Sequence, residues 1–339
     1  MSNLSLPLCH LSLSYEVESD PAAPIVLRST VAMHSILPRV EETEPFGAGC
    51  LFQLYRKLVQ FFCASQHAGT LRQDTQYAHP FAAGATSDVY QGRLLVRNKQ
   101  PLRVAIKIVK YPADRAVRRF EREATIWSQL CHANLVPLLG FVVERNILVS
   151  RFYEHGNVST YLQTNPKANR SQIVLAIASG LKCLHEHNIV HGDLKPGNVL
   201  IDEGGIPLIC DFGISKTLDE HGFTTYSVGT LSYMAPELFI VVSQGAPQPQ
   251  RDSGTTKESD VYSFSLLAFE ILTSQSPKER PRTIFITLEM ESNLRAERMA
   301  YHEHLKERLW EILDPCLDFQ PTGRPCICNV LDGLELALA

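Results

Sequence analysis

Residues 191–198 read HGDLKPGN, a polar stretch whose side chains point to one kind of chemistry. Transfer of a phosphoryl group to a hydroxyl needs a carboxylate that orients the hydroxyl and takes its proton, and Asp193 supplies one. Magnesium on a nucleotide's phosphates prefers oxygen ligands, and the amide of Asn198 offers one five positions later. Lys195 carries a positive charge that can offset the charge on the transferring group. The stretch therefore indicates phosphoryl transfer from a magnesium-bound nucleotide.

Two more motifs follow along the chain. DFG at 211–213 comes directly after an apolar run, which makes Asp211 the main candidate carboxylate ligand of the same metal. Gly213 gives the backbone the freedom to turn there. APE at 235–237 then closes a segment that contains the hydroxyl-bearing residues Thr224, Thr225, Tyr226, Ser227 and Thr230.

In this order and spacing, the motifs resemble those of the eukaryotic protein kinase family, over about 260 residues. Together with DVYSF at 260–264 they are highly specific, whereas DFG alone would carry little weight. The resemblance implies an α+β, bilobal protein kinase fold, with a small antiparallel β lobe containing one helix (76–153) and a larger, mainly helical lobe (154–339). It also implies ATP and Mg²⁺ as cofactors and a serine or threonine hydroxyl of a protein substrate as acceptor.

The resemblance also assigns residues to the nucleotide side of the site. Lys107, in VAIK, stands where the family has a lysine that contacts the α- and β-phosphates. Glu123 stands where the family has its ion-pair partner on the following helix, while the nearby Glu121 is expected to be solvated. Both Lys107 and Glu123 are therefore expected to take part in catalysis.

The glycine-rich phosphate loop of the family is only partly kept. Of its three glycines only Gly84 remains, because Ala82 and Ser87 occupy the other two positions. Small residues still let the backbone approach phosphates, although with less freedom than glycine, so weaker nucleotide binding is expected.

The same alignment with the family's motif positions implies which residues form the adenine pocket. Val89 and Ala105 would sandwich the adenine ring, and Ser150 would be the gatekeeper. Arg151 and Tyr153 would offer backbone groups to the adenine edge.

The resemblance also bears on regulation and specificity. Gly192 replaces the arginine that pairs with an activating phosphate in many family members, which predicts activity that depends little on phosphorylation of residues 224–230. Lys195 and GTLSY at 229–233 favour serine/threonine over tyrosine acceptors.

Other positions suggest a subgroup and two structural contacts. LWEIL at 309–313 and Arg324-Pro325 resemble the tyrosine-kinase-like group, whose fungal members often carry HGDLKP. Arg324 is expected to pair with Glu237, and Asp260 is expected to anchor the 191–198 loop through backbone hydrogen bonds.

Hydrophobic periodicity predicts the elements around these motifs. Alternating residues indicate strands at 88–95, 103–109, 135–143 and 147–152. Helical spacing indicates one helix at 115–130 and another with a face formed by Ile173, Val174, Ile177, Leu181 and Leu184.

Residues 1–75 form an N-terminal extension in this interpretation. Residues 1–45 contain five prolines and no persistent periodicity, so the extension is expected to be partly disordered. Residues 51–62 (LFQLYRKLVQFF) have one apolar stripe, which predicts a helix that either lies on a membrane surface or docks on the protein's own body; docking is favoured. A polar, Gly/Pro-rich loop is predicted at 243–259.

Composition bounds the partners and the compartment. Of 339 residues, 45% are hydrophobic and 20% charged, as in globular proteins. The net charge of −4 gives no sign of a nucleic-acid partner, and no apolar run is long enough for a transmembrane segment. The nine cysteines are scattered, with Cys326 and Cys328 too close together for the usual zinc pair, so reduced thiols in the cytoplasm, or else the nucleus, are expected.

Two other functions compete with an active protein kinase. A pseudokinase scaffold is compatible with the altered glycine loop and with Ser265, where the family usually has glycine. Against it, Lys107, Glu123, Asp193, Asn198 and Asp211 are all present, and a scaffold has no need of them. A small-molecule kinase is disfavoured, because such enzymes generally lack Lys195, the APE segment and the DVYSF helix.

Overall fold

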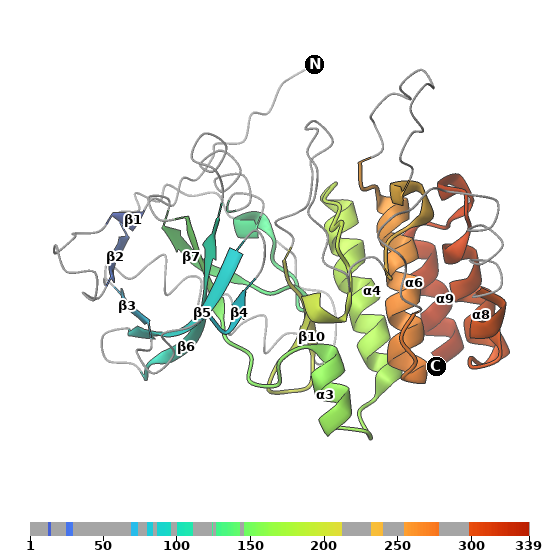
Figure 1. Ribbon diagram of the computed structural model, residues 1–339, viewed down its shortest axis with the longest axis horizontal. Helices are drawn as coiled ribbons and strands as arrows, with labels where there is room; N and C mark the ends of the chain where they lie inside the picture. Colours follow the sequence, from blue (N-terminus) through green and yellow to red (C-terminus); the bar gives the residue numbers. More distant parts are fainter. Residues whose placement is uncertain are drawn as a thin grey trace, which may run out of the picture. The chain divides into compact units, whose positions relative to one another are not determined.

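The chain is described here by a computed structural model in which two compact units are distinguished. Unit 1 takes in residues 1–133 and 137–152, and unit 2 takes in 134–136 and 153–339. The residues that the structure describes are 13–14, 25–29, 69–73, 80–83, 87–95, 100–110, 124, 127–142, 146–211, 232–239, 254–277 and 298–338. Unit 1 is an antiparallel sheet and unit 2 is mainly helical, as the sequence predicted (Figure 1).

The sheet of unit 1 has the strand order β1-β2-β3-β5-β6-β8-β7, and β4 pairs with β5. Its strands are β1 (Leu13–Ser14), β2 (Ile25–Ser29), β3 (Gly69–Gln73), β4 (Ala82–Ala83), β5 (Ser87–Leu95), β6 (Leu102–Val109), β7 (Leu138–Val142) and β8 (Ile147–Arg151). The last four match the predicted strands. Of the predicted helix at 115–130, residues 124 and 127–129 are helical, and the remainder lies largely outside the described residues.

The first two strands correct a prediction. Residues 1–45 were expected to contain no regular element, yet β1 and β2 lie within them and join the sheet through β3. In the register, Ile25 faces Leu71 across more than forty residues of chain. A strand this short depends on such a distant partner, so local periodicity does not reveal it. The helix predicted at 51–62 lies outside the described residues.

The core of the sheet follows from the two-residue alternation of its strands. Val104 and Ile106 on β6 point to the same buried face, whereas Ala105 and Lys107 point to the other. The buried cluster on the core face comprises Leu94, Val104, Ile106, Ile147 and Val149.

Unit 2 is built from five helices and one small hairpin among its described residues. They are α3 (Val158–Thr164), α4 (Arg170–Glu186), β9 (Val199–Ile201), β10 (Pro207–Ile209), α6 (Lys257–Thr273), α8 (Glu307–Leu313) and α9 (Ile327–Leu338), with short 3₁₀ turns at 196–198, 236–239, 314–317 and 321–323. Helix α4 contacts α6, α9 and β10, and Figure 1 shows these helices side by side. In the part of the chain that the structure describes, no helix combines the length and hydropathy needed to cross a membrane.

Helix α4 forms as its sequence predicts. Its first turn is capped by Asn169, whose side chain accepts a hydrogen bond from the Gln172 backbone N–H at 3.1 Å. All residues of the predicted apolar face are buried, namely Ile173, Val174, Ile177, Leu181 and Leu184. Gly180 faces the Asn134 carbonyl so closely that a Cβ would come within 2.8 Å of its oxygen. The glycine therefore lets the helix pack tightly against Asn134.

Helix α6 begins inside the stretch predicted as a loop at 243–259. The Thr256 hydroxyl accepts from the Ser259 N–H at 3.2 Å, and the Ser259 hydroxyl accepts from the Thr256 N–H at 2.9 Å. This reciprocal capping box starts the helix at Lys257, so the loop prediction is wrong for residues 257–259. Residues 243–253 lie outside the described part.

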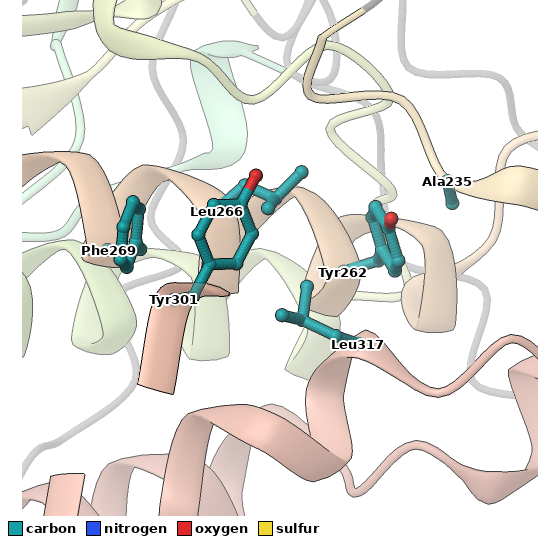
Figure 2. Packing of buried hydrophobic residues seen from close by; sticks show 6 residues of the cluster. All are labelled: Ala235, Tyr262, Leu266, Phe269, Tyr301 and Leu317. Carbon is teal, nitrogen blue, oxygen red and sulfur yellow. The ribbon is translucent and has the colours of Figure 1, made fainter. Parts of the chain in front are cut away.

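The buried face of α6 organises an aromatic cluster. Tyr262, Leu266 and Phe269 project from the helix toward Ala235, Tyr301 and Leu317, as Figure 2 shows. The Phe269 and Tyr301 rings are tilted, with centroids 4.1 Å apart. The cluster joins three segments that are distant in the sequence to one helix, which makes α6 the central element of unit 2.

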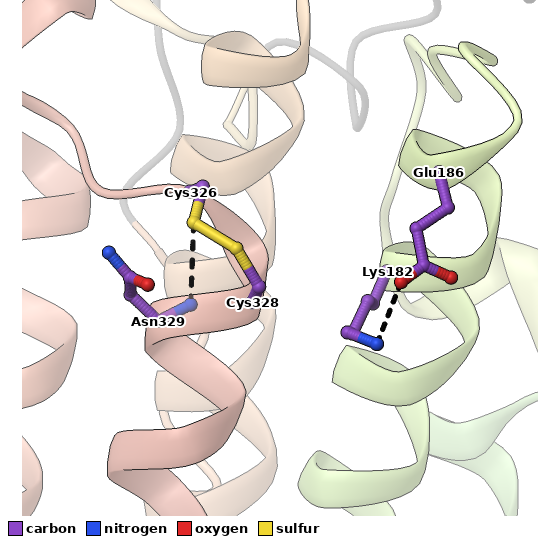
Figure 3. Close-up of a disulfide and its surroundings, with 5 residues drawn as sticks. All are labelled: Lys182, Glu186, Cys326, Cys328 and Asn329. Atoms are coloured by element: carbon purple, nitrogen blue, oxygen red, sulfur yellow. Dashed lines mark hydrogen bonds and ion pairs between the residues drawn. A yellow bond between two sulfur atoms is a disulfide. The ribbon is translucent and has the colours of Figure 1, made fainter.

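The cysteines depart in part from the expectation of reduced thiols. Cys131, Cys183, Cys210 and Cys316 are not disulfide-bonded, whereas Cys326 and Cys328 form a disulfide at the start of α9 (Figure 3). Cys326 precedes the helix, so the backbone bends between the two residues and brings their Cα atoms to 5.4 Å, a distance that a disulfide spans. The expectation is wrong for this pair.

Candidate active site

The 191–198 loop lies between α4 and β9 and is held by one buried carboxylate. Asp260 accepts hydrogen bonds from the backbone N–H groups of His191, at 2.7 Å, and Gly192, at 2.8 Å. The His185 Nε2 atom lies 2.9 Å from the same carboxylate. The expected anchoring role of Asp260 is confirmed, and His185 is an additional partner that the sequence analysis missed. A buried carboxylate needs such donors, and in return it fixes the start of the loop.

His191 ties the loop to the end of β10. Its Nε2 atom lies 2.9 Å from the carbonyl oxygen of Cys210, and its Nδ1 atom lies 3.1 Å from the Asp193 N–H. Because a carbonyl only accepts and an N–H only donates, the tautomer with hydrogen on Nε2 satisfies both contacts. The ring therefore sets the spacing between Asp193 and the residue that precedes Asp211.

Three predicted site residues meet at the Asp193 carboxylate. Lys195 Nζ donates to Asp193 Oδ2 at 2.6 Å. Asn198 Nδ2 donates to the same oxygen at 3.1 Å and to the Asp193 carbonyl at 2.7 Å. These contacts fix the side chain of Asp193 through one of its two oxygens.

The other oxygen of that carboxylate differs. Asp193 Oδ1 is buried and has no hydrogen-bond partner within the described residues. A buried acceptor without a partner costs free energy, so its presence in a folded protein calls for an explanation, and a functional site is one. Of the two oxygens of this carboxylate, Oδ1 is therefore the one that keeps its capacity to accept a hydrogen bond.

Asn198 and Asp211 offer oxygen atoms that fit a magnesium ion. The Asn198 side-chain nitrogen is committed to Asp193, which leaves its amide oxygen for a cation, and the Cys210 N–H donates to the Asn198 carbonyl at 2.9 Å. Asp211 follows directly, with a left-handed backbone at φ 65°. Non-glycine residues seldom adopt this conformation, and they do so preferentially at functional sites. The donor chemistry suits Mg²⁺, which prefers carboxylate and amide oxygens.

Position 192 favours glycine for two reasons, its backbone conformation and its contact with Thr255. Its φ of +76° is left-handed, and a Cβ there would lie 3.1 Å from Thr255 Oγ1. Thr255 is buried, and its hydroxyl has no hydrogen-bond partner among the residues that are described. No sequence pattern pointed to Thr255, because this residue precedes the α6 cap in a stretch predicted as loop.

We expect Gly192→Ala to lower the free energy of unfolding by about 1–3 kcal/mol. A left-handed alanine costs about 1–2 kcal/mol, and Thr255 must also shift. Gly197→Ala in the same loop is the matched control, because φ is ordinary there and the nearest atom lies 3.9 Å from an added Cβ. Urea unfolding of both variants measures their free energies of unfolding. Equal losses of stability in the two variants would show that the left-handed backbone of Gly192 and its contact with Thr255 do not restrict this position.

On unit 1, four predicted residues share one face of three adjacent strands. Val89 on β5 is directly opposite Lys107 on β6, and Ala105 on β6 is directly opposite Ser150 on β8. Directly opposite residues of an antiparallel pair point to the same side, and Ala105 and Lys107 are two residues apart. All four therefore point away from the core face of the sheet.

The remaining nucleotide-side residues are placed separately. Arg151 ends β8 opposite Val104, and the next residue, Phe152, donates its N–H to the Arg103 carbonyl at 3.1 Å. Tyr153 begins the long segment of unit 2 and is buried. Gly84 and Glu123 lie outside the described residues.

The expected ion pair between Arg324 and Glu237 is confirmed. The two outer nitrogens of the guanidinium each donate to one carboxylate oxygen of Glu237 at 2.7 Å. The same side chain, which is fully buried, also donates to the carbonyls of Asp318 and Glu258. This bidentate geometry fixes the APE motif against the start of α6.

A second contact holds the segment before APE. The Tyr233 hydroxyl donates to Glu270 on α6, and the Tyr233 carbonyl accepts from the Ser263 hydroxyl at 2.8 Å. Burial, and then the bond to Glu270, raises the pKa of Tyr233 above its ordinary value, so the phenol stays protonated and remains a donor.

With this geometry in place, comparison with known families gives a definite result. Residues 75–334 match the family described as protein tyrosine and serine/threonine kinase. The chain belongs to the protein kinase family. Its antiparallel sheet unit and its helical unit are the two lobes of the protein kinase fold, so the predicted fold class is confirmed.

Individual relatives of this protein kinase match between 58% and 78% of the chain. The nodulation receptor kinase of Pisum sativum is 28% identical over 78% of this chain and 30% of its own length. The probable serine/threonine-protein kinase PknB of Lactococcus lactis is 32% identical over 60% of this chain and 32% of its own. The L-type lectin-domain containing receptor kinase IV.2 of Arabidopsis thaliana is 34% identical over 58% of this chain and 29% of its own length. The chain spans about a third of the length of these relatives.

Proposed function

We propose that this kinase transfers the γ-phosphate of ATP to serine or threonine hydroxyls of protein substrates. The observation that carries the proposal is the Asp193 carboxylate, with Oδ2 fixed by Lys195 and Asn198 and Oδ1 buried without a partner in the described structure. One oxygen holds the side chain in place while the other is available to a substrate. That division is what orienting an acceptor hydroxyl requires.

The proposed chemistry assigns a step to each residue. Asp193 Oδ1 accepts the hydrogen bond of the acceptor hydroxyl and takes its proton as the oxygen–phosphorus bond forms and the bond to ADP breaks. Lys195, beside Oδ2, offsets negative charge on the migrating phosphoryl group. Asn198 and Asp211 would hold Mg²⁺, which neutralises phosphate charge. Catalysis then rests on positioning and electrostatics, with no covalent enzyme intermediate.

On unit 1, we propose that the face carrying Val89, Ala105 and Lys107 binds the nucleotide. Val89 and Ala105 contact the adenine, and Lys107 contacts the α- and β-phosphates with Glu123 as its ion-pair partner. Arg151 and Tyr153 contribute backbone groups to the adenine edge, and Gly84 lies in the phosphate loop. The shared orientation of the three strand residues supports this assignment.

We assign the kinase to the tyrosine-kinase-like group, on the basis of LWEIL at 309–313, Arg324-Pro325 and HGDLKP. Residues 76–339 would form the kinase domain, with 1–75 as an extension. A reducing compartment, hence the cytoplasm or nucleus, is favoured by four cysteines that are not in a disulfide, namely Cys131, Cys183, Cys210 and Cys316. In that compartment the kinase would act in signal transduction by phosphorylating protein substrates. We propose no nucleic-acid partner.

A non-catalytic scaffold is the second candidate, favoured by Ala82 and Ser87 in the phosphate loop. Ser265, the other departure from the family pattern, has a structural explanation. Its hydroxyl donates to the Leu313 carbonyl at 2.9 Å, which ties α6 to the end of α8. This serine is therefore compatible with catalysis and does not favour the scaffold.

Phosphate transfer from γ-labelled ATP to a peptide array tests the proposal. We expect labelling of serine and threonine peptides, and we expect Asp193→Asn to lower kcat by about 10²–10⁴-fold because the proton acceptor is lost. Asp202→Asn, a surface aspartate whose Oδ1 accepts two turn hydrogen bonds, is the matched control and should keep full activity. Wild-type labelling that does not rise above the background left by Asp193→Asn would favour the scaffold, and labelling confined to tyrosine peptides would overturn the specificity.

A further inference from the structure

The cross-link between Cys326 and Cys328 has no part in the phosphoryl-transfer site. It closes across a single residue at the N-terminal end of α9. Cys326 is exposed and Cys328 is half-buried. We propose that this pair is a reversible thiol–disulfide exchange site, which reacts with small soluble thiols of the glutathione type at the sulfur of Cys326.

A structural role explains this disulfide poorly. The stabilisation from a cross-link grows with the length of the loop that it closes, and this loop is as short as three residues. Helix α9 is already held against its neighbours by the buried side chains of Ile327, Val330, Leu331 and Leu334. Opening the bond therefore leaves the packing of the helix in place, and the fold tolerates both redox forms.

The helix end favours exchange at this position. The Asn329 N–H lies 3.4 Å from Cys326 Sγ, so the sulfur already accepts a bond from the first turn (Figure 3). Unpaired N–H groups and the helix dipole stabilise negative charge there, which favours the thiolate over the thiol. Cys328, in the first turn of the same helix, benefits as the departing thiolate.

Exposure sets the direction of attack. A thiolate of glutathione attacks Cys326 Sγ, the accessible sulfur, forming a mixed disulfide at Cys326 and releasing Cys328 as a thiolate. A second glutathione thiolate attacks the glutathione sulfur of the mixed disulfide, forming oxidised glutathione and releasing the Cys326 thiolate. Two thiols and one protein disulfide become one small disulfide and two protein thiols, a two-electron exchange that runs in either direction.

Other cysteines of the described chain do not share this environment. Cys316 is buried, and burial raises the pKa of Cys316 to about 12, which keeps it as an unreactive thiol. Cys183 is buried as well, whereas Cys131 is exposed and not disulfide-bonded. Cys131 therefore provides an internal reference, a cysteine that reagents in solution can reach but that takes no part in the exchange.

The test uses the intact wild-type chain in glutathione buffers of varied composition. After acid quenching and alkylation, mass spectrometry of peptides reports which cysteines were reduced. We expect Cys326 and Cys328 to change together and reversibly, with a tenfold change in their reduced-to-oxidised ratio for each tenfold change in [GSH]²/[GSSG]. Cys131 should be alkylated whenever the pair is. A disulfide that stays closed in excess reduced glutathione, or thiols that stay open in excess oxidised glutathione, would overturn the proposal.

Two single variants test the direction of attack. With oxidised glutathione, Cys328→Ser should accumulate a mixed disulfide at Cys326 at least tenfold faster than Cys326→Ser accumulates one at Cys328. Equal rates would refute attack at Cys326. These measurements do not require kinase activity, so their outcome is independent of the proposed phosphoryl transfer.

Discussion

Asp260→Ala is expected to lower kcat by about 10²-fold or more, because misplacing a catalytic group by about 1 Å can have that effect. Asp260 touches no reacting group in the proposed mechanism. Its carboxylate holds the N–H groups of His191 and Gly192, and through them the position of Asp193. Without it, the 191–198 loop loses both of its anchors to α6.

The same substitution should also destabilise unit 2. Each buried N–H left without an acceptor costs about 1–3 kcal/mol, and the His185 ring loses its partner as well. Phosphotransfer kinetics and urea unfolding of the same preparation measure both effects. Asp260→Asn, which keeps one acceptor oxygen, should fall between wild type and Asp260→Ala in both assays. Retention of wild-type kcat by Asp260→Ala would show that the loop keeps its geometry without the anchor.

Arg324→Ala should lower the free energy of unfolding of unit 2 by about 3–5 kcal/mol. The guanidinium is buried and bonds to Glu237 and to three backbone carbonyls, so its removal leaves an unpaired carboxylate and unsatisfied oxygens. Arg324→Lys should recover only part of the loss, because an ammonium cannot make the two parallel bonds. In thermal unfolding, Tm should fall by about 2–4 °C for each kcal/mol of lost stability.

A second arginine pair in the same unit provides the control. Arg298 also binds an aspartate, Asp314, through two nitrogens, but both side chains are more than a quarter exposed. Solvent screens such a pair, so Arg298→Ala should cost only about 1 kcal/mol. A double-mutant cycle with Glu237→Gln should give a coupling of more than about 1 kcal/mol for Arg324, since the two side chains share one set of bonds. Equal effects of the two arginine variants would contradict the importance of burial.

The motifs of unit 2 could be predicted from the sequence because their chemistry is local. HGDLKPGN brings Asp193, Lys195 and Asn198 within a few residues of each other, and the loop needs only one turn to let them meet. The pairing of Arg324 with Glu237 was also accessible, but only through resemblance to a family, because 87 residues separate the two.

What the sequence did not reveal depends on distant or geometric information. β2 forms because β3 pairs with it, and the pattern of five residues does not specify that partner. The start of α6 was assigned to a loop because its first turn is polar, although the Thr256 and Ser259 capping box is what a polar helix start looks like. Thr255 was missed since its relevance comes only from its distance to Gly192.

Helix α6 supports both the 191–198 loop and the segment that precedes the APE motif. From this one helix Asp260 holds the 191–198 loop, Glu270 and Ser263 hold Tyr233, and the Tyr262 ring lies beneath the Arg324 guanidinium. The 191–198 loop and the segment before the APE motif therefore both depend on the folding of this one helix. On heating, this kinase should lose its activity in one step as unit 2 melts, without first passing through a folded but inactive stage.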